Sequence, residues 1–269
     1  MRKRTVTVAI GVATGLLAGL LGVGGGLIMV PGMTQLLKMR QHEAVGTSLL
    51  VIIPIALVGA LVLGQSHDVD PLVGVILAVA SIGGAVLGAR LTRTLSDRTL
   101  RRVFAIAVLV VAVIMLVSAG ATMLHAGIGS HPGSRPSGAL LVVLGLAIGL
   151  LTGIVSGLLG IGGGIVMVPA MVLILGLSQH LAQGTSLFVI VPTAAAGSVT
   201  HFRLGNIRLA VAGWLAIGGI AGAVAGAMLA LLVPDQALRI LFAVFLVYTG
   251  GRMYRQRGAA AVRMKPRCL

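Results

Sequence analysis

The sequence predicts an all-α integral membrane protein built from two homologous halves. The chain is 58% hydrophobic and only 9% charged, whereas soluble domains carry about 25% charged residues. Two glycine-rich stretches, 15–31 and 153–169, align without a gap because Gly24 corresponds to Gly162, an offset of 138 residues. Apolar runs of about 20 residues, the length that crosses a bilayer, follow each stretch. We expect an inverted repeat in which each half has one glycine-broken, re-entrant helical element and three transmembrane helices.

The repeat continues well beyond the glycines. Repeats of this kind are sought before a fold is assigned, because they define the structural unit. The matching pairs include Gln41-His42 with Gln179-His180, Gly46-Thr47-Ser48-Leu49 with Gly184-Thr185-Ser186-Leu187, Pro54 with Pro192, Gly84 with Gly222, Gly88 with Gly226, and Asp97 with Asp235.

The apolar runs divide the chain. Glycine-broken elements are expected at about 5–37 and 139–176, and spans at about 44–63, 71–91, 101–121, 181–200, 209–232 and 238–254. A stretch rich in Gly, Pro and Ser between the halves indicates an exposed loop. We therefore assign 1–124 to the first membrane repeat, 125–138 to an extracytoplasmic linker, 139–254 to the second repeat and 255–269 to a basic cytoplasmic tail.

The basic residues favour hairpins over single crossings for the glycine-broken elements. If each element crosses once, twelve of the 20 Lys and Arg residues fall on the cytoplasmic side. If each enters and leaves on the same side, the cytoplasmic side holds eighteen of the 20, and only Arg135 and Arg239 lie outside. Positive charge collects on the cytoplasmic side, so the hairpins are preferred. Three crossings and a hairpin per half then invert the second half relative to the first, as in many secondary transporters.

Composition argues against other classes. The net charge of +15 could indicate nucleic-acid binding, but the basic residues lie at the ends of apolar runs and aromatic residues make up 3% of the chain. This pattern is typical of a cytoplasmic membrane face. The first apolar run resembles a signal peptide, but the same motif recurs internally, so we expect it to be mature structure. The single cysteine, Cys268, excludes an intrachain disulfide and a cysteine metal cluster, and we expect no metal and no cofactor.

The glycine clusters permit chemistry at membrane depth. Glycine allows positive φ and close approach of another group, and non-helical backbone survives within a bilayer only where protein or a watery cavity surrounds it. A short helix is expected after each break, at about 27–37 and 165–176, so its N-terminus should lie near the bilayer midplane. Free N–H groups and the helix dipole attract anions there. Two such termini facing one another would form an anion site.

The candidate substrate-binding residues come from both copies. They are the break glycines, the Thr-Ser pairs of the following spans, and one histidine: Gly22, Gly24, Gly25, Gly26, Thr47, Ser48, Gly160, Gly162, Gly163, Gly164, Thr185, Ser186 and His201. Two other roles stay open. The spacings within 15–22, Gly84 to Gly88 and Gly222 to Gly226 also suit close helix packing. The Thr and Ser hydroxyls could instead bond to backbone carbonyls one turn back.

No enzyme is expected. Ser198 and His201 are one helical turn apart, but no nucleophile motif or acidic orienting group accompanies them. His42 and His180 recur in the repeat without metal spacing. None of the five carboxylates lies inside an expected span, although proton or sodium coupling usually leaves such a residue there. An anion leaving a cell with a negative interior gains about 2.3 kcal/mol per charge per 100 mV, so uncoupled export is a reasonable hypothesis.

The sequence resembles the sulfite exporter TauE/SafE family of membrane permeases. The resemblance rests on the doubled Gly-Leu-Leu-Gly-x-Gly-Gly-Gly-x-x-x-Val-Pro at 19–31 and 157–169, on Gly-Thr-Ser at 46–48 and 184–186, and on the segment 201–207. It covers about residues 7–254. It implies a bacterial inner-membrane transporter of anions such as sulfite or sulfoacetate. The counterpart of Gly205-Asn206 is His67-Asp68, and this departure from the repeat argues against a symmetric role for this loop.

Together these observations predict a multi-pass permease in the bacterial inner membrane with both termini cytoplasmic. Its partners would be a small sulfur-containing or organic anion and membrane lipid, and not nucleic acid. The sequence leaves the oligomeric state, the identity of the anion and the coupling ion open. The alternative is a non-transporting membrane scaffold or partner subunit.

Overall fold

The computed structural model describes residues 2–91, 108–117 and 136–255, and this part of the chain is helical with short connections. A short apolar helix covers Val108–Val117. The other helices are α1 (Arg2–Leu21), α2 (Gly26–Gln35), α3 (Gln41–Gln65), α4 (Pro71–Leu91), α6 (Ala139–Leu159), α7 (Gly164–Leu173), α8 (Gln179–Arg203), α9 (Leu209–Leu232) and α10 (Asp235–Arg255). The starts of α2, α3 and α4 are each displaced by 138 residues from those of α7, α8 and α9.

The two halves are interleaved. Helix α1 packs along α9, and α4 packs along α6, so the outer helices of each half pair with those of the other half. Small residues allow these close crossings: the backbone of Gly15 meets Gly219, and that of Gly153 meets Ser81. Gly84 meets Leu150 in the same way. The packing role expected for these glycine spacings is therefore confirmed, and the halves do not form separate cores.

Helices α3 and α8 lie side by side at the centre of the bundle. Several of their apolar side chains, including Leu49, Ile52, Leu187 and Ile190, are fully buried. Each helix begins where a polar side chain satisfies a free backbone N–H: Glu43 accepts from the N–H of Arg40 at 3.3 Å, and Ser178 accepts from that of Leu181 at 3.3 Å. Such caps stabilise helix starts. Each of the two helices is 25 residues long and apolar enough to cross a membrane.

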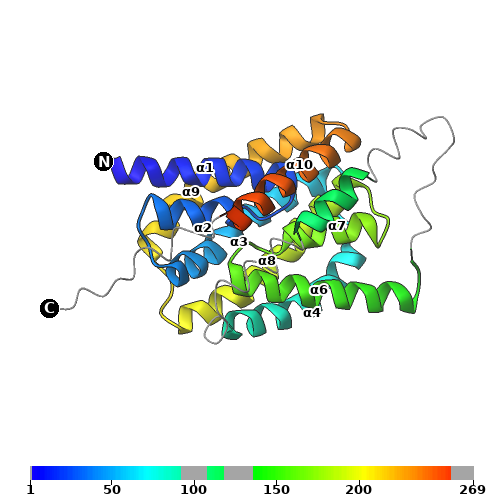
Figure 1. Cartoon of the computed structure of the whole chain (residues 1–269), viewed down its shortest axis with the longest axis horizontal. Coiled ribbons are helices and arrows are strands. Elements are labelled where there is room, and N and C mark those ends of the chain that lie inside the picture. Colours follow the sequence, from blue (N-terminus) through cyan, green and yellow to red (C-terminus); the bar gives the residue numbers. More distant parts are fainter. Residues whose placement is uncertain (1, 92–107, 118–135, 256–269) are drawn as a thin grey trace.

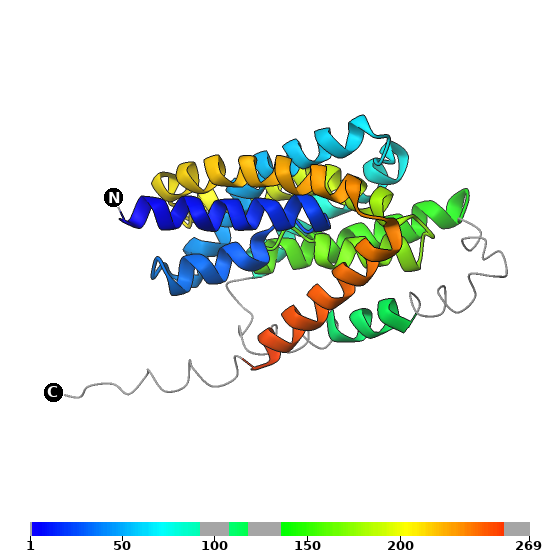
Figure 2. The same ribbon diagram turned by 90° about the horizontal axis from the view of Figure 1, so that it is seen from above.

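The first helices of the two halves enter the bundle from opposite ends (Figures 1 and 2). Helix α1 begins at one end of the bundle and α6 begins at the opposite end, and both stop inside it (Figures 1 and 2). Helix α2 then turns back toward the end where α1 began, and α7 turns back toward the end where α6 began (Figure 1). The chain therefore forms two helical hairpins whose tips lie within the bundle.

The two ends of the bundle differ in charge. At the basic end, which we define by Arg4, Arg40 and Arg208, the guanidinium carbon of Arg4 lies 5.3 Å from the ring centroid of Trp214. There Arg208 also donates to Glu43 at 2.9 Å.

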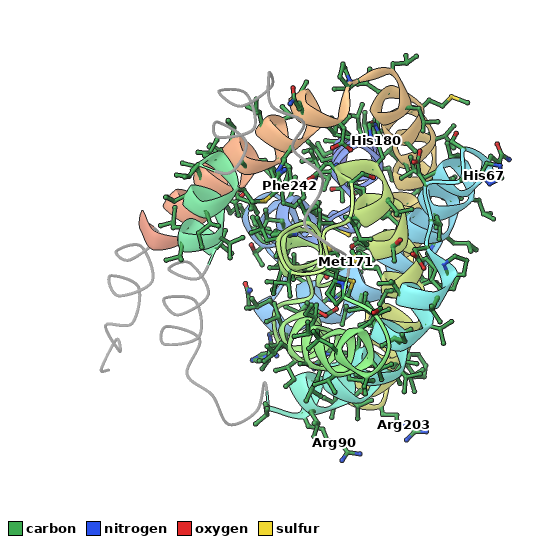
Figure 3. The ribbon with its side chains drawn as sticks, turned by 90° about the vertical axis from the view of Figure 1, so that its right-hand side faces the viewer. His67, Arg90, Met171, His180, Arg203 and Phe242 are labelled. Atoms are coloured by element: carbon green, nitrogen blue, oxygen red, sulfur yellow. The ribbon has the colours of Figure 1, made fainter. Side chains whose placement is uncertain are left out.

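At the acidic end, which we define by Asp68, Asp70 and Asp235, His180 Nδ1 lies 3.1 Å from Asp235 Oδ1. Figure 3 looks onto this end and labels His67 and His180, with the buried Met171 of α7 in the middle of the bundle.

The outer surface of the bundle is apolar. Large hydrophobic side chains such as Leu72, Val79, Leu151 and Leu232 are exposed on its helices, and a surface of this kind suits contact with lipid. Helices α1, α3, α4, α6, α8 and α9 are each long and apolar enough to cross a membrane. The chain is thus a multi-pass membrane protein.

Parts of the expected organisation fall outside the described residues. The span expected at 101–121 is described only as the helix Val108–Val117, and the linker 125–138 and the tail 255–269 lie almost entirely outside. The run expected at 238–254 is helical within α10. The proposed boundaries of the halves stay predictions.

Candidate functional site: two facing helix breaks

Left-handed glycines interrupt both hairpins at equivalent positions. In the first break, Gly22, Gly24 and Gly25 have φ values of 69°, 74° and 78°. In the second, φ is 66°, 89° and 82° at the three corresponding residues, Gly160, Gly162 and Gly163. A residue with a Cβ adopts this region at a cost of about 1–2 kcal/mol, so the glycines specify where the helices stop.

Each break is followed by a helix N-terminus that has no side-chain cap. Helix α2 begins after Gly25 and α7 begins after Gly163, and neither N-terminus has a side-chain cap. The carbonyl of Gly25 accepts from the N–H groups of Ile28 and Met29 at 3.2 and 3.3 Å. The N–H groups of residues 26 and 27 precede these first helical bonds, so they lie among the four that a helix leaves unsatisfied. The predicted short helices are confirmed, with starts one residue earlier than expected.

The two breaks touch one another. A methyl group added at Gly162 would lie 3.5 Å from the Cα of Gly24. One added at Gly26 would meet the carbonyl oxygen of Gly160 and lie 2.7 Å from the Cα of Ile161. The equivalent methyl at Gly164 would meet the carbonyl of Gly22. The absence of side chains therefore lets both helix N-termini approach a single place in the bundle.

The serines of the expected Thr-Ser pairs fasten each break to the other half. Ser48 donates to the carbonyl of Gly160 at 2.8 Å, and Ser186 donates to that of Gly22 at 2.9 Å. Ser48 also donates to Val45 at 2.8 Å, three residues back in its own helix. The serines thus lie at the breaks, and their hydrogen bonds go to backbone carbonyls, including the bond from Ser48 one turn back that the alternative role predicts.

The threonines of these pairs hold the two short loops that enter α4 and α9. Thr185 Oγ1 accepts from the N–H of Asp70 at 2.9 Å, and Thr47 Oγ1 accepts from that of Arg208 at 3.1 Å. The loops are equivalent in the repeat although one carries a carboxylate where the other carries a guanidinium. Burial raises the pKa of the neighbouring Asp68, and the hydrogen bond to Glu43 raises the pKa of Arg208.

His201 lies apart from the breaks. It is buried in the last turn of α8, and its Nε2 is 3.3 Å from the carbonyl oxygen of Gly157. Gly157 precedes the second break by three residues. The adjacent Arg203 is exposed at the end of α8 and does not bring a charge to the breaks.

Three further polar side chains lie at the breaks, and they belong to none of the motifs from which the candidate site was predicted. Thr14, Ser156 and Gln183 are fully buried, and their polar side-chain atoms make no hydrogen bond within the described protein. Thr14 contacts Gly25, Ser156 contacts Gly163, and the Cα and Cβ of Gln183 lie against Gly22. The one feature of the sequence that could have identified them is a polar residue within an otherwise apolar run.

The described helices around the breaks carry no Asp, Glu, Lys or Arg beside them. The sequence has no Asp, Glu, Lys or Arg within 5–37, 44–67, 71–89, 139–202 or 209–234, the ranges that contain the helices around both breaks. The described part of the chain also holds no group of three His, Cys, Asp or Glu side chains that could bind a metal. Among the residues that the structure describes here, a ligand at the breaks would therefore meet amide, hydroxyl and carboxamide groups rather than ionised side chains.

Interleaved apolar helices, broken within the bundle to leave uncapped N-termini, form a polytopic membrane protein with broken helices of the kind found in many secondary transporters. The family model described as "Sulfite exporter TauE/SafE" matches residues 1–115 and 144–268. The chain therefore belongs to the TauE/SafE sulfite exporter family, and the resemblance found in the sequence is confirmed.

The curated relatives are named as transporters. The chain is 29% identical over 259 residues to "Probable membrane transporter protein YunE" of Bacillus subtilis, which covers 91% of this chain and 95% of that protein. It is 27% identical over 232 residues to "Probable membrane transporter protein YdhB" of the same organism, with coverage of 86% and 91%. A "Probable membrane transporter protein" of Xylella fastidiosa is 32% identical over 118 residues, which are 43% of this chain and 45% of that protein. No solved structure matches the chain.

Proposed function

We propose that this protein is a permease for small sulfur-containing or organic anions of the sulfite, sulfonate or sulfoacetate type, and that the anion binds between the two glycine breaks. The observation that carries the proposal is the contact between two glycine breaks within an apolar bundle, each followed by an uncapped helix N-terminus whose first residue, Gly26 or Gly164, lies against the opposite break. Helix N-termini present N–H groups and a positive dipole end to anions.

Magnitudes indicate how such a site would work. Removing a full anion from water costs tens of kcal/mol at low dielectric, whereas one helix terminus returns about 0.3–2 kcal/mol. Hydrogen bonds to a charged group add about 1.5–3 kcal/mol each. Two termini with several donors can therefore hold an anion that keeps part of its hydration, and such weak binding suits a permease that must release its substrate.

We further propose that the halves form an inverted repeat in the membrane, with α1–α2 and α6–α7 as re-entrant hairpins. The opposite entry of α1 and α6 into the bundle (Figures 1 and 2) and the exchange of helix partners between halves support this arrangement. The basic end, with Arg4, Arg40 and Arg208, would face the cytoplasm, because positive charge collects on that side.

Cysteine accessibility tests the proposed topology. In a Cys268→Ser background, a cysteine at Lys38, in the loop before α3, should react only with reagents that reach the cytoplasm. A cysteine at Ser178, in the loop before α8, should react with impermeant reagents added outside the cell. Both positions are exposed. Cytoplasmic reactivity at Ser178 would rule out the inverted hairpin arrangement.

The direction we propose is export driven by the membrane potential. The described carboxylates Glu43, Asp68, Asp70 and Asp235 lie in first turns or loops rather than in the middle of spans. This placement disfavours carboxylate-based coupling to protons or sodium. An anion leaving the cell gains about 2.3 kcal/mol per charge per 100 mV, which is sufficient to drive efflux without a coupling ion.

A flux assay with purified protein tests the function. Proteoliposomes carrying an imposed potential, without a pH gradient, should move sulfite or a sulfonate, and Gly24→Val or Gly162→Val should abolish that flux. Gly205→Val is the matched control, because Gly205 also has a left-handed φ of 71° but an added Cβ there would meet no atom within 4 Å. A scaffold protein would show no flux in any form, and normal flux in both break variants would contradict the proposed site.

A further inference from the structure

The framework around the breaks follows the repeat closely. Ser48 and Ser186 make equivalent bonds to the opposite break, at 2.8 and 2.9 Å. The two threonines beside them hold equivalent loops. Positions related by the offset of 138 residues therefore occupy the same surroundings, and each residue can be compared directly with its counterpart in the other half.

Beside the breaks, two buried polar residues with unsatisfied side chains depart from this equivalence. Ser156 in α6 corresponds to Ala18 in α1, and Gln183 in α8 corresponds to Val45 in α3. All four are buried, with exposures of 0% for Ser156, Gln183 and Ala18 and 4% for Val45. The hydroxyl of Ser156 and both polar atoms of the Gln183 carboxamide make no hydrogen bond with any residue that the structure describes. The apolar counterparts indicate that the fold accepts a hydrophobic side chain at each position.

Ser156 lies at the N-terminus of α7, and Gln183 lies against Gly22, whose carbonyl contacts the first residue of that helix. A methyl group added at Gly163, the N-cap of α7, would lie 3.5 Å from Ser156 Cβ. One added at Gly22 would lie 2.7 Å from the Cα and 2.9 Å from the Cβ of Gln183. The carbonyl of Gly22 in turn meets Gly164, the first residue of α7.

The N-terminus of α2 has apolar neighbours at the equivalent places. Ala18 Cβ lies 3.3 Å from a methyl group added at Gly25, and Val45 Cγ1 lies 2.9 Å from one added at Gly160. The surroundings of the two termini thus differ in polarity although their backbones are alike.

We infer that the anion is anchored at the N-terminus of α7, with Ser156 and Gln183 as the side chains that recognise it. A buried polar group without a partner weakens a fold, and nothing in the described protein compensates for it at these two positions. Hydroxyl and carboxamide groups donate hydrogen bonds to oxyanions without adding a charge. The N–H groups of α7 and these two side chains would then surround one face of the substrate.

The other buried polar groups do not share all of these features. Thr14 contacts the N-terminus of α2, but its counterpart is also a threonine, Thr152. Gln179 likewise corresponds to a glutamine. His201 corresponds to an apolar leucine, but it bonds to Gly157 rather than to a break residue. Within the described residues, Ser156 and Gln183 alone combine burial, unsatisfied polar atoms, contact with a break and an apolar counterpart.

The counterpart residues supply the test, which rests on the proposed function. Ser156→Ala and Gln183→Val replace each residue by its counterpart in the first half, Ala18 or Val45. We expect each variant to unfold in detergent at the same temperature as the natural protein or higher, because an unsatisfied group is removed. Apparent affinity for sulfite in the flux assay should fall about tenfold or more for each, as expected for the loss of a hydrogen bond to a charged group.

Ser198→Ala is the control. Ser198 is also buried in α8, but its hydroxyl donates to Ala195 in its own helix at 3.1 Å, so affinity should not change. If the natural protein moves no anion, the proposed function fails and this inference fails with it. If it transports and Ser156→Ala and Gln183→Val bind sulfite normally, only this inference fails. A clearly lowered unfolding temperature would show that the side chains serve the fold, and would also overturn it.

Discussion

Replacing Gly26 by alanine should force the two breaks apart. The added Cβ would meet the carbonyl oxygen of Gly160 and lie 2.7 Å from the Cα of Ile161. Carbon atoms pack at about 3.5–4.0 Å, so the first residue of α2 and the second break must separate by about 1 Å. Both neighbouring atoms belong to the backbone, and no side-chain rotation can relieve the contact.

This displacement should affect transport more than folding. Overpacking costs about 1–3 kcal/mol, which would lower the unfolding temperature moderately. Hydrogen bonds from N–H to oxygen span about 2.7–3.2 Å, so a shift of 1 Å would remove a donor from an anion held between the termini. One lost bond to a charged group, about 1.5–3 kcal/mol, corresponds to a loss of about tenfold or more in apparent affinity.

The assay is sulfite flux into proteoliposomes, with the amount of inserted protein measured alongside. Gly213→Ala in α9 is the control, because an added Cβ there would meet no atom within 4 Å. That exposed helical position should gain up to about 1 kcal/mol of stability from alanine and keep normal flux. Equal flux in Gly26→Ala and Gly213→Ala, at equal insertion, would refute the reasoning.

Three further predictions concern the serines, the charge of the substrate and the acidic end. Ser48→Ala should cost about 1–3 kcal/mol, because it leaves the buried carbonyl of Gly160 without this donor; thermal unfolding measures it, and no change would argue against the fastening role. A neutral site should transport methanesulfonate better than sulfate, since the Born cost of a divalent anion is about four times that of a monovalent one; competition assays with both anions would decide, and preferred transport of sulfate would contradict the neutral site. Because burial raises the pKa of Asp68 above its ordinary 3.8, the folded protein holds this proton more tightly than the unfolded chain, and the carboxyl becomes unfavourable as pH rises through its folded pKa. Asp68→Asn should therefore raise the unfolding temperature at neutral pH and lose that advantage below about pH 4, and a constant difference across this range would exclude the burial effect.

Much of the fold could be predicted from the sequence, because local chemistry determined it. The offset between Gly24 and Gly162 gave the equivalent halves, and the positive φ at both positions follows from what glycine alone permits. The expected helix at 27–37 is α2, Gly26–Gln35, which ends two residues earlier than expected.

The pairing of helices needed the tertiary structure. Small-residue spacings in α1 and α4 predict close packing, but they do not name the partner, because many helices in this chain carry glycine at the same spacing. Only the assembled bundle places α1 against α9 and α4 against α6. The bonds of Ser48 and Ser186 to the opposite half depend on that pairing, so residue type alone could not distinguish them from bonds one turn back.

The sequence by itself determined the membrane class, the repeat, the family and the places where the helices break, since each depends on composition or on neighbouring residues. The tertiary structure decided that the two breaks meet, and that Ser156 lies against Gly163 and Gln183 against Gly22 with no hydrogen-bond partner for their polar side-chain atoms among the described residues. These facts depend on contacts between residues far apart in the chain. In the sequence, a serine among apolar residues looks the same whether its hydroxyl bonds to its own helix or faces a binding site.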